Sequence, residues 1–106
     1  MIGILEIFAM LILIKGVYKL TIEKLEECFN NAIKINANYI GVKIQMQGFS
    51  EPEIIINKRE NFKAKLEYYK RAYNKDLTLK AFNGIKIIDF DFGDNFDFLE
   101  KLTAQI

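Results

Sequence analysis

The 106-residue chain has no histidine and no tryptophan, and it contains one cysteine and one proline. Without histidine it has no imidazole acid or base, no imidazole to activate a serine or cysteine, and no imidazole metal ligand. The lone Cys28 has no partner for an internal disulfide, which suits a reducing cytosol. Phosphate loops, dinucleotide fingerprints and CxxC pairs are absent as well. These absences favour binding over catalysis and indicate no cofactor.

Strong charge of either sign is also missing. The formal net charge is +1, with 27% charged and 51% apolar residues. This balance is typical of a globular domain and argues against a partner such as extended nucleic acid, which usually requires a strongly basic face. The length fits one domain with one core.

Residues 1–17 form an apolar N-terminal segment, in which Met1–Ile14 is interrupted only by Glu6 among charged residues. The segment lacks the basic start of a secretory signal, and it is shorter than the roughly 20 residues that span a membrane. A small domain does not easily cover such a segment on all sides. We expect Met1–Ile14 to form a homo-oligomer contact; an extra core element and membrane association are the alternatives.

Three stretches have helical spacing of apolar residues. Thr21 is a suitable N-cap for the first helix, which the sequence ends near Asn36. Asn57 and Glu60 have the spacing of a capping box, which predicts a second helix reaching residue 74. Asp94 is expected to cap the last helix.

Four stretches read as strands. Residues 39–47 alternate apolar and polar side chains, and the β-branched run at 53–57 suits a returning strand. Residues 77–81 alternate up to Asn83-Gly84, which predicts a tight hairpin with both turn residues at positive φ. Ile85 and Ile87 share one phase, whereas Ile88 and Phe90 share the other. This change of phase predicts a β-bulge near Ile87 or a strand buried on both sides.

The order is helix-strand-strand-helix-strand-strand-helix after the apolar segment. Short connections favour antiparallel pairing. We therefore expect an α+β fold over residues 18–106, a single two-layer domain with an antiparallel four-stranded sheet and its helices on one face.

The spacing of Asp89, Asp91, Asp94 and Asp97 raises the hypothesis of a divalent metal. An EF-hand loop beginning at Asp89 would require glycine at position 94, where this chain has aspartate. A metal-dependent hydrolase using Asp89, Asp91 and Asp94 is therefore the alternative function. A solvated acidic edge that opposes aggregation is the interpretation we favour, and we expect no metal site.

Basic and aromatic residues surround the predicted second helix. Cationic side chains beside tyrosines and a helix N-terminus suit a phosphate or a nucleobase. An ordinary solvated helix face is the simpler interpretation of the same charges. The predicted ligand-binding residues are Asn57, Arg59, Lys63, Tyr69 and Arg71. Cys28, with no base near it in the sequence, is interpreted as a small buried hydrophobe.

The segments PEIIIN, ENFKAKLEYYKRAY and DLTLKAFNGIKIIDFDFG, at residues 52–57, 60–73 and 76–93, resemble small phage and prophage proteins of low-GC Gram-positive bacteria. The resemblance implies an accessory phage protein in the cytosol of its bacterial host. Such proteins often inhibit host defence, either by blocking a defence protein or by sequestering a nucleotide signal. We therefore expect a non-enzymatic binding protein of this kind; a structural or membrane-associated phage component is a further alternative.

Overall fold

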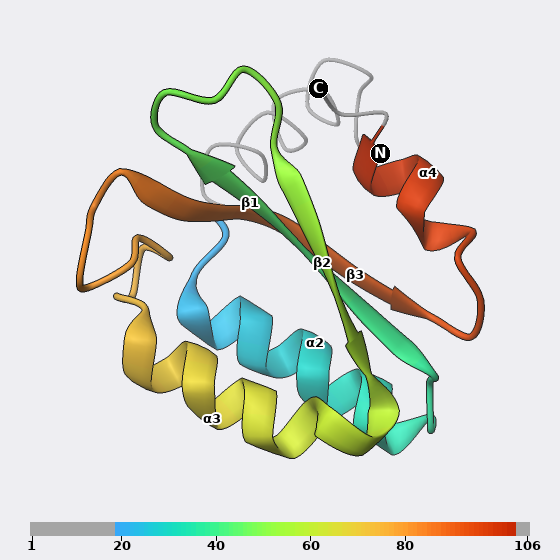
Figure 1. Ribbon diagram of the computed structural model, residues 1–106. Coiled ribbons are helices and arrows are strands. Elements are labelled where there is room, and N and C mark those ends of the chain that lie inside the picture. Colours follow the sequence, from blue (N-terminus) through green and yellow to red (C-terminus); the bar gives the residue numbers. More distant parts are fainter. Residues whose placement is uncertain (1–18, 104–106) are drawn as a thin grey trace, which may run out of the picture.

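A computed structural model describes residues 19–103 of the chain, and Figure 1 shows their arrangement. Within this part, three strands form an antiparallel sheet in the order β2-β1-β3, with three α-helices packed on it. This confirms the α+β class and the antiparallel pairing. The predicted contact through Met1–Ile14 lies outside the described residues. The elements are α2 (Ile22–Lys34), β1 (Tyr39–Met46), β2 (Glu53–Lys58), the 3-10 helix η1 (Arg59–Asn61), α3 (Phe62–Ala72), β3 (Ile85–Gly93) and α4 (Phe98–Thr103).

Helix α2 begins and ends as its sequence predicts. The Thr21 hydroxyl accepts a hydrogen bond from the backbone N–H of Lys24 at 3.4 Å, which satisfies one of the free donors of the first turn. At the other end Asn36 has φ 61. The N–H groups of Asn36 and Ala37 donate back to the carbonyls of Ile33 and Ala32. This is a Schellman motif, in which the left-handed residue turns the chain directly into β1.

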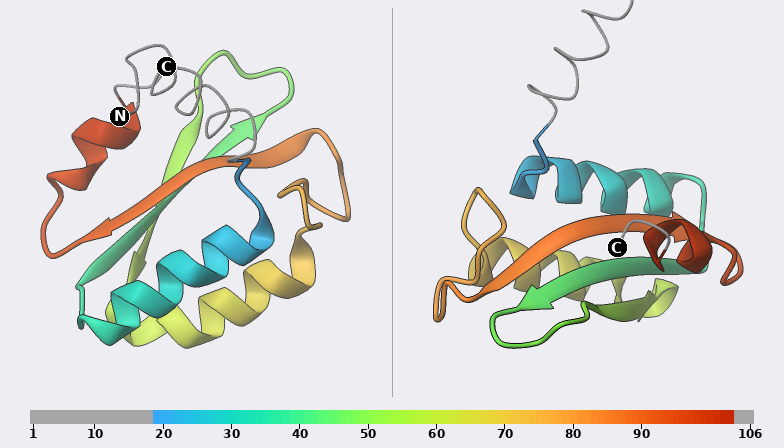
Figure 2. Two further views of the ribbon diagram at one scale, coloured as in Figure 1. Left: turned by 180° about the vertical axis from the view of Figure 1, so that it is seen from behind. Right: turned by 90° about the horizontal axis from the view of Figure 1, so that it is seen from above.

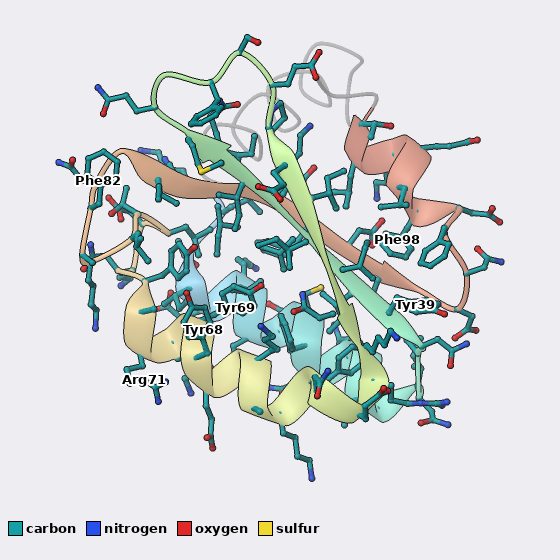
Figure 3. The ribbon with its side chains drawn as sticks, viewed as in Figure 1. Tyr39, Tyr68, Tyr69, Arg71, Phe82 and Phe98 are labelled. Atoms are coloured by element: carbon teal, nitrogen blue, oxygen red, sulfur yellow. The ribbon has the colours of Figure 1, made fainter. Side chains whose placement is uncertain are left out.

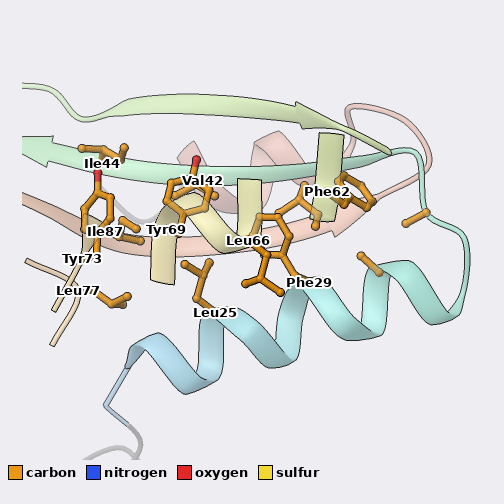
Figure 4. Packing of buried hydrophobic residues seen from close by; sticks show 13 residues of the cluster. Leu25, Phe29, Val42, Ile44, Phe62, Leu66, Tyr69, Tyr73, Leu77 and Ile87 are labelled. Atoms are coloured by element: carbon orange, nitrogen blue, oxygen red, sulfur yellow. The ribbon is translucent and has the colours of Figure 1, made fainter. Parts of the chain in front are cut away.

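Helices α2 and α3 pack on the same face of the sheet and enclose the main core (Figure 4). The face of β1 that carries Ile40, Val42 and Ile44 supplies the sheet side of this core. Phe29 of α2 contacts Phe62 and Tyr69 of α3 edge-on or tilted, with ring centroids 6.0 and 5.9 Å apart. Such geometries are the favoured ones for buried aromatic pairs. Burial of this shared apolar surface is therefore the main stabilising contribution to the fold.

Helix α4 lies on the opposite face of the sheet, so the expectation that all helices share one face was wrong. A Cβ atom added at Gly41 would lie 2.6 Å from Cε2 of Phe98 and 3.0 Å from Cδ1 of Leu102. The missing side chain thus admits α4 close to β1. Lys43 on the same face is only 2% exposed, and its Nζ donates to the Leu102 carbonyl at 2.5 Å. A lysine that reads as solvent-facing in the sequence is covered by the helix.

The predicted β-bulge in the last strand is confirmed. Lys43 of β1 pairs with Asp89, whereas the next residue, Ile44, pairs with Ile87. Ile88 is therefore the additional residue on β3. A bulge reverses the alternation of side chains along a strand. The apolar residues on both sides of it consequently reach the same core. They are Ile85, Ile87, Phe90 and Phe92.

The predicted strand at 77–81 does not form, and the four-stranded sheet is corrected to three strands within residues 19–103. Leu77 has φ 72 and is fully buried, so the chain turns there and inserts the side chain into the core. Asp76 stabilises this turn by accepting a hydrogen bond from the N–H of Thr78 at 3.1 Å. Only the bridge between Thr78 and Lys86 remains of the expected pairing.

Three local expectations about turns and caps were also wrong. Neither Asn83 nor Gly84 has a positive φ, and the N–H of Ile85 closes an ordinary turn to the Phe82 carbonyl at 3.2 Å. Asn57 belongs to β2 and is buried, so it caps no helix. Asp94 lies in the loop before α4, which begins only at Phe98.

None of the helices within residues 19–103 is long and apolar enough to cross a membrane.

The close approach of α4 to β1 predicts that Gly41→Ala destabilises the protein. The added methyl group would overlap the Phe98 ring, and overpacking of this kind costs about 1–3 kcal/mol. Urea denaturation measures the change in the free energy of unfolding. A Phe98→Ala background removes the closest contact and leaves that with Leu102 at 3.0 Å, so the cost of the methyl group should fall below that in the parent chain. Equal costs in the two backgrounds would show that α4 does not pack on Gly41.

Candidate functional site

The structure brings together two of the five predicted ligand-binding residues. Arg59 and Lys63 are exposed and line the same hollow at the start of α3. Asn57 and Tyr69 are each 2% exposed and belong to the interior. Arg71 is exposed near the C-terminal end of α3, far from Tyr39 at the other end of the molecule (Figure 3). Only Arg59 and Lys63 are therefore placed to act on one ligand.

Asn57 and Tyr69 interact with each other beneath the sheet. Burial raises the pKa of the Tyr69 hydroxyl, and the polar side chain of Asn57 beside it partly offsets this. The Nδ2 atom of Asn57 donates to the Ile40 carbonyl at 3.2 Å. Its Oδ1 atom is buried and has no hydrogen-bond partner among the described residues. These contacts join β1, β2 and α3 and give both residues a structural role.

Arg59 is held by the turn that ends α2. Its backbone N–H donates to the Asn38 carbonyl at 3.0 Å, and its Nη1 donates to the Asn36 carbonyl at 3.3 Å. The Asn38 side chain in turn donates to the Asp94 carbonyl at 2.9 Å. Three connections therefore meet at one end of the sheet: α2 to β1, β2 to α3, and β3 to α4. Arg59 lies at their junction with part of its donor capacity already used for positioning.

Two adjoining hollows flank Arg59, and we call them together the Arg59 cleft. One has a volume of about 300 Å³ and the other about 260 Å³. Arg59 and Glu60 line both of them. The larger hollow is completed by Ile33, Asn36, Phe62 and Lys63. The smaller is completed by Asn38, Tyr39 and Lys58.

The charge around the Arg59 cleft is mostly positive. Lys58, Arg59 and Lys63 are exposed, and none of the ion pairs within residues 19–103 involves them. Glu60 is the single carboxylate among the lining residues. Three cations that are not neutralised by a carboxylate contact favour an anionic ligand, and a guanidinium is suited to bind a phosphate through two parallel hydrogen bonds.

An aromatic pair borders the cleft. The rings of Tyr39 and Phe96 lie 4.7 Å apart between centroids, tilted by 35°. Phe96 is 53% exposed, and Tyr39 lines the smaller hollow. Exposed ring surface beside cationic groups is suited to stacking against a planar base. Tyr39 was not predicted because it begins a strand distant in sequence from Arg59. Lys58 directly precedes Arg59 but was not among the predicted ligand-binding residues.

The acidic residues of β3 are placed differently from a metal site. Asp89 and Asp91 each accept the N–H of the following residue at 2.8 Å, and Asp91 also lies 3.6 Å from the Nζ of Lys101. Asp94 is exposed in the loop beyond the strand. No group of three or more potential ligands within residues 19–103 is arranged to hold a metal ion.

Another hollow, of about 710 Å³, lies apart from the Arg59 cleft. It is lined around the start of α2 by Thr21, Lys75 and Asp76, among others. The polar groups of these three residues are engaged. Thr21 caps α2, Lys75 lies 3.7 Å from Glu23, and Asp76 accepts from Thr78. Lys19 and Lys86 also line this hollow and take part in none of the ion pairs within residues 19–103, but no aromatic residue lines it. Because the Arg59 cleft combines its cations with Phe62 and Tyr39, we place the candidate site there.

No protein-family model, curated protein sequence or solved structure matches this chain.

Cys28 is predicted to react slowly with thiol reagents. Burial raises the pKa of its thiol to about 12, and the nearby carboxylates of Asp91 and Asp89 add to the effect. Because only the thiolate is nucleophilic, reaction with Ellman's reagent at pH 8 should be roughly 10²–10³ times slower than for a free cysteine. Denaturant should restore the ordinary rate. The structure leaves Cys28 only partly buried, packed against the core, and not fully buried as predicted. Rapid labelling of the folded chain would contradict the interpretation of Cys28 as an inert residue.

Proposed function

We propose that this chain is a non-enzymatic binding protein whose Arg59 cleft holds a small anionic ligand of the nucleotide type. The observation that carries the proposal is the convergence of Lys58, Arg59 and Lys63 on two adjoining hollows. Phosphate would bind at these cations, and Tyr39 offers a ring surface at the edge of the smaller hollow for a base.

The size and wall chemistry of the cleft support a small ligand. Small-molecule sites combine apolar walls with a few polar groups that fix orientation. Ile33 and Phe62 supply apolar surface in the larger hollow, where Arg59 and Lys63 supply charge. The combined volume of about 300 and 260 Å³ suits a mononucleotide or dinucleotide better than a polymer. The nearly neutral net charge agrees with a ligand that is bound locally.

The biological role that we propose follows from the resemblance to phage proteins. In an infected bacterial cytosol, a protein that binds a nucleotide signal stoichiometrically would withdraw it from a host defence system. Such a role needs affinity and abundance but no catalysis. Direct blockage of a defence protein is the other form of the same proposal, and the exposed cations of the cleft would then face an acidic surface of that partner.

Calorimetry against cyclic nucleotides and ADP-ribose derivatives tests the proposal. We expect one of these ligands to bind, and Lys63→Gln to weaken that binding at least tenfold, because a charge-assisted contact to phosphate contributes about 1.5–3 kcal/mol. Arg59→Gln should weaken binding further, since Arg59 lines both hollows.

Arg71→Gln is the matched control, because it removes the same charge from the far end of the same helix (Figure 3). It should leave the affinity unchanged within about twofold. An equal loss for Arg71→Gln would show that only net charge matters. Absence of heat with every ligand in the panel would remove the nucleotide form of the proposal.

A further inference from the structure

Within residues 19–103, strand β2 is an edge of the sheet with no strand on its outer side. It pairs with β1 on one side only, and in the order β2-β1-β3 it lies at the margin (Figure 2). Its sequence, Glu53–Lys58, contains three consecutive isoleucines. Edge strands usually carry a central charge, a proline or a bulge that prevents pairing with another chain. Within β2 the central positions carry none of these.

The hydrogen-bonding groups that β2 directs outward are defined by its register. The backbone N–H of Arg59 donates to the Asn38 carbonyl, which continues the ladder whose pairs include Ile40 with Asn57. Bonded and non-bonded pairs alternate along antiparallel strands. Residues 53, 55 and 57 therefore bond to β1, whereas Ile54, Ile56 and Lys58 direct their N–H and carbonyl groups away from it.

We propose that the outer edge of β2 is a homodimer interface, in which β2 pairs antiparallel with β2 of a second copy. A second copy of this chain suits the edge because the charges at the two ends of β2 are complementary to those of an antiparallel β2. The strand begins with Glu53 and ends with Lys58, and it is flanked by Glu51 before its start and by Arg59 after its end. Antiparallel pairing of two identical strands places the acidic end of each beside the basic end of the other, which is favourable.

One register of the β2–β2 pair opposes only residues that have a backbone N–H to donate. Opposed residues in an antiparallel pair share a face, and the outward-directed residues must face one another. Centring the pair on Ile56 places Ile54 opposite Lys58 of the other copy, and Glu53 next to Arg59, which directly follows the strand as the first residue of η1. A register centred on Ile55 would set Pro52, which has no N–H, opposite Lys58. The register centred on Ile56 is therefore favoured.

The dimer would join the two sheets into one, with α2 and α3 of both copies on the same side. A pairing of one six-residue strand from each copy is small beside the roughly 1,600 Å² of a typical stable interface. We therefore expect dissociation in the micromolar range.

Two measurements on the full chain test the proposal: hydrogen exchange of the β2 amides, and sedimentation to follow the monomer–dimer equilibrium. The amides of Ile54 and Ile56 should be protected at millimolar and exposed at low micromolar concentration, in step with a monomer–dimer equilibrium. Ile56→Pro should abolish the dimer, since it removes an outward N–H and leaves the bonds to β1 intact. Glu53→Lys should weaken the dimer at least fivefold by opposing like charges, without requiring any change in backbone conformation.

Glu67→Lys is the matched control, because it makes the same charge change at an exposed position on α3. It should leave the dissociation constant unchanged. A chain that stays monomeric at millimolar concentration would overturn the proposal. An oligomer that is insensitive to both β2 variants would also overturn it. Protection of Ile54 and Ile56 that does not depend on concentration would do the same, because it would indicate that a segment of the same chain covers the edge.

Discussion

Strand β1 is the element on which the rest of the described structure depends. It is hydrogen-bonded to β2 on one edge and to β3 on the other, and both of its faces are covered. One face packs against α2 and α3; the other, through Gly41 and Lys43, packs against α4. A strand constrained on four sides has one register available to each neighbour. That register places Tyr39 and Lys58 side by side and so fixes one wall of the Arg59 cleft.

Features determined by short-range chemistry were predictable from the sequence. Thr21 and Asn36 end α2 through hydrogen bonds that span only a few residues. The bulge at Ile88 was visible as a change of phase, because each half of β3 must direct its apolar residues to the same core. Features determined by distant neighbours were not predictable. Leu77 lies in an alternating run, but it fills a core position in a left-handed turn. Gly41 gave no sign that it admits a helix.

The candidate site shows the same division. Arg59 and Lys63 were chosen for charge near a helix start, and the structure places both in the cleft. Asn57 and Tyr69 were chosen for residue type alone, yet both are buried in contact with each other. Tyr69 follows Phe62 and Leu66 at helical spacing, which is a sign of burial, whereas Asn57 has no such sign in the sequence. Tyr39 reaches the cleft only because β1 and β2 pair, and this pairing joins residues far apart in sequence.

The central claim is that the meeting of three connections around Arg59 forms the ligand site. Chemical-shift mapping on the isotopically labelled chain during titration with ADP-ribose measures this most directly. The account predicts that the largest amide shifts occur at Asn38, Tyr39, Arg59 and Lys63, with small shifts along the C-terminal half of α3. Shifts confined to the hollow beside Thr21 and Lys75, with none around Arg59, would contradict it.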